Sequence, residues 1–300
     1  MSHLTLTPSD LDPGKLHAFL LGGIAPRPIA FASTVDSEGR VNLAPFSYFN
    51  VFSANPPVLI FSPARRGRDN TTKHTLENVL EVPEVVVNMV DYNTVHACSL
   101  ASTEYAKGVN EFEKAGLTEV VSDLITPPRV LEAPASFECK VLRVDSFGDN
   151  PGAGQLVVCE ILKMHFREDV LNEAGVPDAK KLDLVGRCGG SFYVRASGEA
   201  LFEVPKPLAN LGMGVDSIPE DIRTSSYLSG KHLAMLGNVE VLPDETEVND
   251  YKLMDLSEFF LEFQDDGSAL EITLHKHAAE LLDSGDVDGA WKTLLSFNLG

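Results

Sequence analysis

The strongest chemical signal in the sequence is a basic loop at residues 63–73. It carries four cations within nine positions, and a single acidic residue, Asp69, offsets them. The four are Arg65, Arg66, Arg68 and Lys73. A helix is predicted from Lys73 to Glu81, and backbone N–H groups at a helix start, surrounded by Arg and Lys, bind phosphate well. The alternative is a solvated basic loop that docks the chain's own acidic segment.

A second candidate is the segment 44–50, which reads APFSYFN. Small, hydroxyl, amide and aromatic residues alternate in it. Such a segment offers hydrogen-bond partners and flat apolar faces to a planar polar ligand. An ordinary strand with Ser47 and Asn50 at its wet end explains the spacing equally well.

Other common catalytic patterns are missing from the sequence. No Ser/His/Asp or Cys/His arrangement stands in a recognisable context, and no GxGxxG follows a predicted strand. The four cysteines are widely spaced, which predicts free thiols in a reducing compartment; they are Cys98, Cys139, Cys159 and Cys188. His275 and His277 point to different faces of a helix, so we expect no metal site.

Composition and charge restrict the class of protein. The chain has 300 residues and a formal net charge of −20, which argues against nucleic acid and anionic membranes as partners. No apolar run approaches the roughly 18 residues of a membrane span. The first ten residues lack the plan of a signal peptide, so a cytoplasmic location is expected.

The charge is unevenly distributed along the chain. Residues 1–198 carry 18 Lys and Arg against 24 Asp and Glu, a net −6, whereas residues 199–300 carry 6 against 20, a net −14. The shift and the sequence Pro205-Lys206-Pro207 predict a boundary between a domain at 1–205 and an acidic extension at 206–300.

Strands must position both candidate segments. Three extended runs follow one another with short turns, which predicts antiparallel pairing because no crossover helix fits between them. They are Arg27–Val35, Val41–Phe49 and Val58–Phe61. Further strands are predicted at Glu84–Val90, Ala135–Ser146, Gln155–Arg167 and Ser191–Arg195. Helices are predicted at Lys15–Leu21 and Tyr92–Lys114, the second with Gly108 as a weak point or break.

The extension is predicted to be mostly helical. Candidate helices are Pro219–Ser226, Ser229–Leu236, Lys252–Phe263, Leu270–Leu282 and Val287–Phe297. The third has an apolar stripe, which we expect to pack on the barrel or on a partner chain. Trp291 is expected to anchor the last helix against a neighbour.

Residues 15–200 resemble the flavin reductase-like family with the FMN-binding split-barrel fold. The resemblance is carried by Pro26–Asn50, Lys73–Asn78, Phe112–Leu117, Pro134–Val141 and Gly186–Arg195, in the family's order. It implies a mainly β fold with added helices, namely a closed antiparallel Greek-key barrel of about six strands. It also implies a homodimer with the flavin at the interface.

The resemblance further implies which residues hold FMN. Thr34 and the run Ser47, Tyr48, Phe49 and Asn50 would line the isoalloxazine ring. Ser62, one or more of Arg65, Arg66 and Arg68, and Lys73 with Thr75 would hold the phosphate. Two positions depart from the family pattern: His74 replaces an aspartate, and the strand near Gln155 lacks the histidine that short flavin reductases carry. His165, at the far end of that strand, is a poor substitute, which weakens the case for efficient NAD(P)H use.

The resemblance therefore implies an FMN-dependent oxidoreductase, of the NAD(P)H-dependent flavin reductase type. The cofactor would carry the chemistry, so no catalytic side chain is assigned. NADH or NADPH would be a transient donor, and a small molecule or free flavin the acceptor. Two alternatives stay open: a flavoredoxin-like electron-transfer protein with a protein partner, and a non-catalytic binding module on the same barrel.

Overall fold

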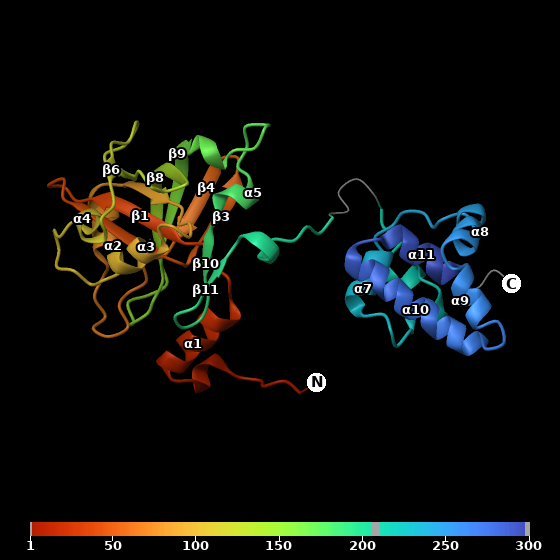
Figure 1. The fold of residues 1–300 in the computed structure, drawn as a ribbon. Helices are drawn as coiled ribbons and strands as arrows, with labels where there is room; N and C mark the ends of the chain where they lie inside the picture. The colour runs from red at the N-terminus through yellow and green to blue at the C-terminus, as the bar shows by residue number, and fades with distance from the viewer. Residues whose placement is uncertain (1, 206–210, 298–300) are drawn as a thin grey trace. The chain divides into compact units, whose positions relative to one another are not determined.

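A computed structural model describes residues 2–205 and 211–297 of the chain. The chain divides into two compact units, Met1–Phe202 and Glu203–Gly300. The division lies close to Pro205, whereas Lys206 and Pro207 of the expected boundary lie outside the described residues. Figure 1 shows the strands of the first unit and the helices of the second.

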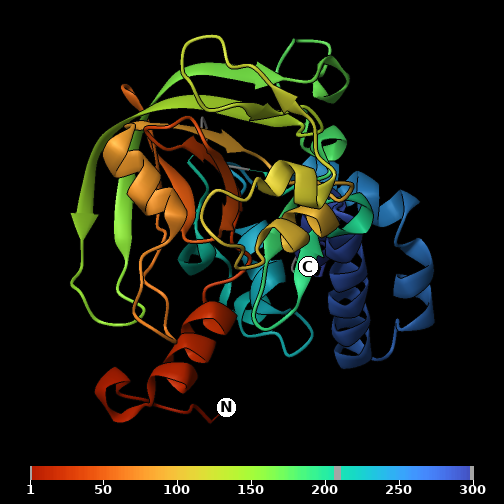
Figure 2. The same cartoon turned by 90° about the vertical axis from the view of Figure 1, so that its left-hand side faces the viewer.

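The first unit is built on one antiparallel sheet in the order β2-β1-β5-β8-β9-β4-β3. The strands are β1 Ala30–Val35, β2 Val41–Phe46, β3 Phe49–Ala54, β4 Pro57–Phe61, β5 Glu84–Asn88, β8 Ala135–Ser146 and β9 Gln155–Phe166. β8 and β9 form the expected long hairpin, and Figure 2 shows these two strands curving around the side of the sheet where α2 packs.

The expected strand Val41–Phe49 is in fact two strands. β2 ends at Phe46 and β3 begins at Phe49, so only Ser47 and Tyr48 lie between them. β2 and β3 stand at opposite ends of the strand order, and three Cα–Cα steps reach at most about 11 Å. The two edges of the sheet therefore come close together at Ser47 and Tyr48.

The expected closed barrel of about six strands is not confirmed. The hydrogen-bonded order is an open sheet of seven strands, and among the described residues β2 pairs only with β1 and β3 only with β4. With its helices, the chain is mixed α/β rather than mainly β. Two small hairpins complete the strands: β6 Glu119–Val120 with β7 Arg129–Val130, and β10 Val185–Arg187 with β11 Tyr193–Arg195.

Helices cover both faces of this sheet. α2, His74–Glu81, buries Leu76 and Val79 against a core that contains Phe61 and Val85. α3, Val95–Ala101, and α4, Glu111–Ala115, cover the other face. The helical stretch expected over Tyr92–Lys114 forms two helices, because a loop with Gly108 at φ +86°, the expected weak point or break, separates α3 from α4. Shorter helical elements are η1 Pro8–Asp10, α1 Pro13–Gly23, η2 Glu168–Val170, α5 Ala179–Leu182 and η3 Gly198–Ala200.

The second unit is helical, as expected. Its elements are η4 Val215–Ser217, α6 Glu220–Arg223, α7 Gly230–Leu236, α8 Glu245–Met254, α9 Ser257–Glu262, α10 Gly267–Ser284 and α11 Val287–Leu295. The helix expected over Lys252–Phe263 is interrupted between α8 and α9, where Leu256 is buried. Its aromatic residues Phe259, Phe260 and Phe263 pack beside Leu270 and Leu274 of α10, so they serve this unit's own core. None of the described helices is long and apolar enough to cross a membrane.

Candidate functional site

A pocket of about 490 Å³ opens in the first unit beside the link between β2 and β3. Its walls come from β2 and the link, the basic loop, the start of α2, the end of α3 with the loop after it, two residues of α1, and single residues of α4 and β10. We call it the main pocket. Its polar and charged lining residues are His17, Asn42, Ser47, Tyr48, Ser62, Arg66, Lys73, His74, Thr75, Ser102, Thr103, Glu104, Tyr105, Glu111 and Arg187. Its volume is that of a small-molecule or cofactor site.

The main pocket brings together residues from both segments singled out in the sequence. Six of the expected site residues line it: Ser47, Tyr48, Ser62, Arg66, Lys73 and Thr75. Residues 44–48 supply an apolar wall with Pro45 and Phe46, and the basic loop supplies the cations. The two segments are therefore parts of one site.

The other five expected site residues do not line this pocket. Thr34 is buried and accepts a hydrogen bond from Asn78 Nδ2. The Arg65 guanidinium donates to the side chain and carbonyl of Asn70. Phe49 packs against the core, Asn50 is exposed on β3, and the Arg68 side chain is 76% exposed.

The cations of the basic loop converge on one carboxylate, that of Glu104. Its oxygens lie 3.2 Å from Arg66 Nε, 2.7 Å from Arg68 Nη2 and 3.6 Å from Lys73 Nζ. Desolvation alone would raise the pKa of Glu104, but the charges of these three side chains outweigh it and lower the pKa. The chain thus places its own anion where a ligand phosphate would gain the same contacts. Glu104 belongs to the first unit, so the acidic extension is not needed to neutralise the loop.

Hydrogen bonds hold Arg66 and the hydroxyl groups of the main pocket in place. The Arg66 guanidinium donates to Thr71 Oγ1 and to the Thr72 carbonyl, which fixes its position. Thr75 Oγ1 accepts from Asn42 Nδ2 at 2.9 Å, and Ser62 Oγ accepts from the Gln155 N–H at 2.9 Å. Because these donors and hydroxyls are already oriented, little conformational entropy would be lost on binding an anion.

His74 is the first residue of α2 and lines the pocket. Burial lowers its pKa, and the charges of Arg66, Lys107 and Lys73 lower it further, against an opposing effect of Glu77. The imidazole is therefore neutral at pH 7. At the position where the family has an aspartate, this chain has an uncharged ring that does not repel a phosphate.

Three charged lining residues were missed by the sequence reasoning: Glu104, Glu111 and Arg187. Glu111 is 5% exposed, its Oε2 accepts the Leu43 N–H at 2.9 Å, and burial raises its pKa. It was missed because residues 92–114 were expected to be helical apart from a weak point or break at Gly108. The N-cap residue Asn110, just before Glu111, was the available signal for a new helix start.

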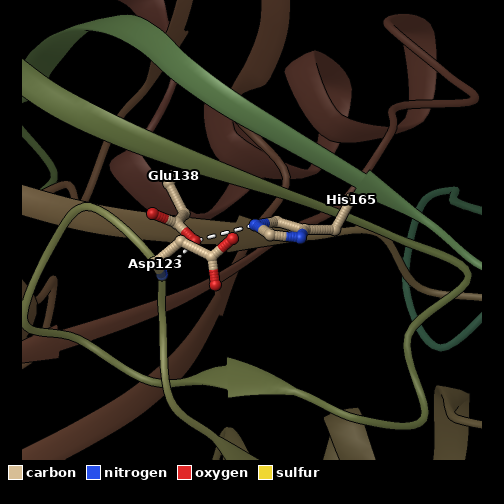
Figure 3. A group of neighbouring side chains, drawn as sticks. All are labelled: Asp123, Glu138 and His165. Carbon is tan, nitrogen blue, oxygen red and sulfur yellow. Dashed lines mark hydrogen bonds and ion pairs between the residues drawn. The ribbon is translucent and has the colours of Figure 1, made fainter.

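A separate cluster of Asp123, Glu138 and His165 has ligand atoms within 4.8 Å of one another (Figure 3). The buried Glu138 carboxylate is already occupied, because it accepts the N–H groups of Asp123 and Leu124 and contacts His165 Nε2 at 2.7 Å. Lys163 pairs with Asp123, and Arg129 lies 4.0 Å from Glu138. Two cations disfavour a metal, so the cluster anchors the 123–124 loop to the sheet. His165 does not line the main pocket or a smaller pocket of about 210 Å³ that adjoins it.

Comparison with known proteins agrees with the fold of the first unit. Residues 22–182 match the family described as "Flavin reductase like domain". Nitrilotriacetate monooxygenase component B from Bacillus cereus is 32% identical, with a TM-score of 0.63 over 68% of this chain and 100% of that one. Pseudomonas fluorescens 2-nitrobenzoate 2-nitroreductase is 30% identical, with a TM-score of 0.60 over 70% and 100%. A split-barrel chain from Shewanella frigidimarina, 22% identical with a TM-score of 0.56 over 66% and 96%, shows the same fold.

The site and these likenesses define a flavin-binding oxidoreductase. The chain belongs to the flavin reductase-like family, as its sequence predicts. The family match ends at residue 182, so the helical second unit lies outside it.

Proposed function

We propose that this protein binds FMN in the main pocket and is an NAD(P)H-dependent oxidoreductase of the flavin reductase type. The observation that carries the proposal is the meeting of Arg66, Lys73 and Thr75 with the apolar wall at residues 44–48. The cations and hydroxyl suit the phosphate end of a flavin nucleotide, and the wall suits its ring. Such a division of one pocket into a charged and a flat apolar part is what FMN requires.

The residues of the pocket fit FMN at its phosphate end. Lys73 and Arg66 would pair with the phosphate, while Ser62 and Thr75 offer hydroxyls and the first turn of α2 offers N–H groups. Glu104 must give up its cations for this to happen, and its exposed carboxylate can turn into solvent. No contact with FMN is assigned to the expected site residues that do not line the main pocket, namely Thr34, Phe49, Asn50, Arg65 and Arg68.

The ring of FMN would lie along residues 44–48. Bound flavin supplies two-electron chemistry with a nicotinamide donor, and the protein orients it and excludes water. Tyr48 and Phe46 offer aromatic surface, and Ser47 offers a hydroxyl at the turn between the sheet edges. No acid–base side chain is required for this role.

We also propose a homodimer. β3 is an edge strand, and Val51 and Phe52 on it are both 64% exposed. An exposed apolar edge strand next to the pocket favours contact with a second copy, which would then close the flavin site.

An electron-transfer role is the second candidate. It is favoured by the absence of a histidine near Gly154 and Gln155 in the sequence and by the engagement of His165 with Glu138. In that case FMN would stay tightly bound and pass electrons to a protein partner. The likenesses to a monooxygenase component and to a nitroreductase favour an enzyme with a freely diffusing acceptor.

The test is an FMN titration of the full chain followed by anaerobic addition of NADH or NADPH. We expect flavin fluorescence to change saturably with FMN and the bound flavin to be bleached by at least one of the two nucleotides. Turnover of added free flavin or of a nitroaromatic acid would identify the acceptor. Retention of FMN without bleaching by either nucleotide would favour the electron-transfer role, and failure to bind FMN would refute the whole proposal.

A further inference from the structure

A smaller pocket of about 210 Å³ adjoins the main pocket, and we call it the side pocket. The two share Pro45, Phe46, Ser47, Ser102 and Arg187 in their walls. A molecule in the side pocket would therefore lie against whatever occupies the main pocket. The side pocket is therefore placed to hold a second ligand in contact with the first, and is not a remote site.

The size and lining of the side pocket restrict what it can hold. An apolar cavity of roughly 150 Å³ binds benzene. The side pocket is somewhat larger, with Ile29 and Phe46 as apolar walls and Ser99 and Ser102 as hydroxyl-bearing ones. It suits a single ring with one small polar substituent, and it is too small for a dinucleotide.

Among the described residues, Arg187 is the one charged side chain that lines the side pocket, and no acidic residue does so. The guanidinium stacks on the Tyr193 ring at 4.7 Å and donates to the Phe192 carbonyl at 3.3 Å. Within residues 2–205 and 211–297 it forms no ion pair with a carboxylate. Arg195, two residues beyond Tyr193 in the same hairpin, differs in this respect: it stacks on Tyr92, and Asp183 neutralises it through two 2.7 Å contacts.

A second arginine without a carboxylate partner among the described residues, Arg27, pairs with Arg187 through the backbone, although Arg27 itself does not line either pocket and its Nη1 donates to the carbonyls of Leu21 and Ile24. Arg27 is 6% exposed, and the two residues exchange backbone hydrogen bonds of 3.0 and 2.8 Å. Arg27 Nε donates to Ser47 Oγ, and its buried Nη2 has no partner among the described residues. Arg187 in the pocket wall, with the buried charge of Arg27 at the paired backbone position, favours an anion there, in a protein whose acidic residues outnumber basic ones by 20.

We propose that the side pocket binds a single-ring carboxylate, with the carboxylate on Arg187 and the ring between Ile29 and Phe46. A planar guanidinium matches a carboxylate through two parallel hydrogen bonds, which gives both charge and orientation. The role of the acid as a second substrate beside the flavin rests on the proposed function, whereas its binding to the side pocket does not. Cys98 also lines the side pocket, but burial raises its pKa to about 12, so it remains a neutral thiol.

The test compares 4-fluorobenzoate with neutral 4-fluorobenzamide by ¹⁹F NMR, on the FMN-loaded and the FMN-free full-length protein. We expect the acid to bind at least tenfold more tightly than the amide. Arg187→Gln should reduce this preference to less than threefold, and Ser99→Leu should remove binding of the acid by filling the pocket. Arg195→Gln is the matched control, because its charge is already paired, and it should keep the preference.

The outcomes separate this inference from the proposed function. FMN binding is measured independently through flavin fluorescence. A protein that binds FMN but prefers the amide, or binds both probes equally, overturns the inference alone. A protein that binds no FMN yet prefers the acid overturns the proposed function alone. If Arg187→Gln fails to fold, the inference is still tested by the preference of the wild-type protein for the acid and by the loss of acid binding in Ser99→Leu.

Discussion

Glu104 shows how a single side chain balances the basic loop. The Glu104 carboxylate contacts Arg66, Arg68 and Lys73 at once. Exposed ion pairs of this kind contribute little stability, so a doubly charged phosphate can replace it at small cost. Glu104 thus neutralises the cation cluster when no ligand is bound, and a phosphate can still bind to the same cations.

Lys73→Ala is expected to weaken FMN binding by tenfold or more. A charge-assisted contact contributes roughly 1.5–3 kcal/mol, and Lys73 lines the pocket at the start of α2. The dissociation constant is measured by flavin fluorescence titration. Arg68→Ala is the comparison variant, because Arg68 is exposed and does not line the pocket, and its effect should stay below threefold. Equal effects of the two changes would contradict the assignment.

Glu104→Gln is expected to tighten FMN binding several-fold. The change removes the anion that competes for Arg66 and Lys73, while the amide keeps the size of the side chain. The same titration at low and high salt tests it, and the gain should shrink as salt screens the charges. Weaker binding in the variant would show that Glu104 organises the cations for the ligand rather than competing with it.

Glu111→Gln is expected to change how stability depends on pH. Because burial raises the pKa of Glu111, the folded protein binds this proton more tightly than the unfolded chain does. The free energy of unfolding of the wild type therefore loses a contribution as pH rises from about 4 through the raised pKa, and the variant should lack this loss. Denaturant unfolding between pH 4 and 7 measures the difference, with the exposed neighbour Glu113→Gln as control. The stability of the variant minus that of the wild type should rise with pH, and a fall would contradict the raised pKa of Glu111.

At the level of elements, two features build the site. The two-residue link between β2 and β3 brings the sheet edges together and turns Ser47 and Tyr48 into the main pocket. The hairpin of β10 and β11 then brings Arg187 to the same place, through the bridge from Arg187 to Arg27. The pocket thus depends on contacts between segments about 160 residues apart in the sequence.

Gly186→Ala should destabilise the first unit by about 1–3 kcal/mol through overpacking. A Cβ at Gly186 would stand 2.9 Å from Pro26 Cβ and 3.2 Å from Val194 Cγ1, so the hairpin would have to shift away from Arg27. Thermal unfolding measures the loss. Gly22→Ala is the control, because its Cβ would meet nothing within 4 Å in a helix, where alanine is preferred. An unchanged melting temperature for Gly186→Ala would show that the hairpin is loosely held.

On the scale of the whole molecule, each unit has its own core. The sole tryptophan of the chain, Trp291, is 1% exposed in the second unit, where its Nε1 donates to the Leu236 carbonyl at 3.1 Å. Every residue of the main pocket lies in the first unit. Fluorescence of Trp291 therefore follows the folding of the second unit, and release of bound flavin follows that of the first.

Trp291 fluorescence and flavin release are expected to give different unfolding midpoints in guanidinium chloride. The first signal follows the second unit, and the second follows the main pocket. Adding FMN in excess should raise only the midpoint of flavin release, since ligand binding stabilises the unit that holds the ligand. Trp291→Phe should lower the stability of the second unit alone, as seen by circular dichroism, with FMN affinity unchanged. Coincident midpoints that shift together would show that the two units unfold as one.

The sequence by itself determined the local features of this protein. The hairpin of β8 and β9, the helix after the basic loop, the cations and the helical second unit follow from periodicity, turn residues and charge, which act over short distances along the chain. Only the tertiary structure decided which polar groups share the pocket. Arg65 and Arg66 are adjacent in sequence, yet Arg65 is turned to Asn70 while Arg66 lines the pocket. Glu104 and Arg187 join the site through long-range packing, which has no signature in local sequence.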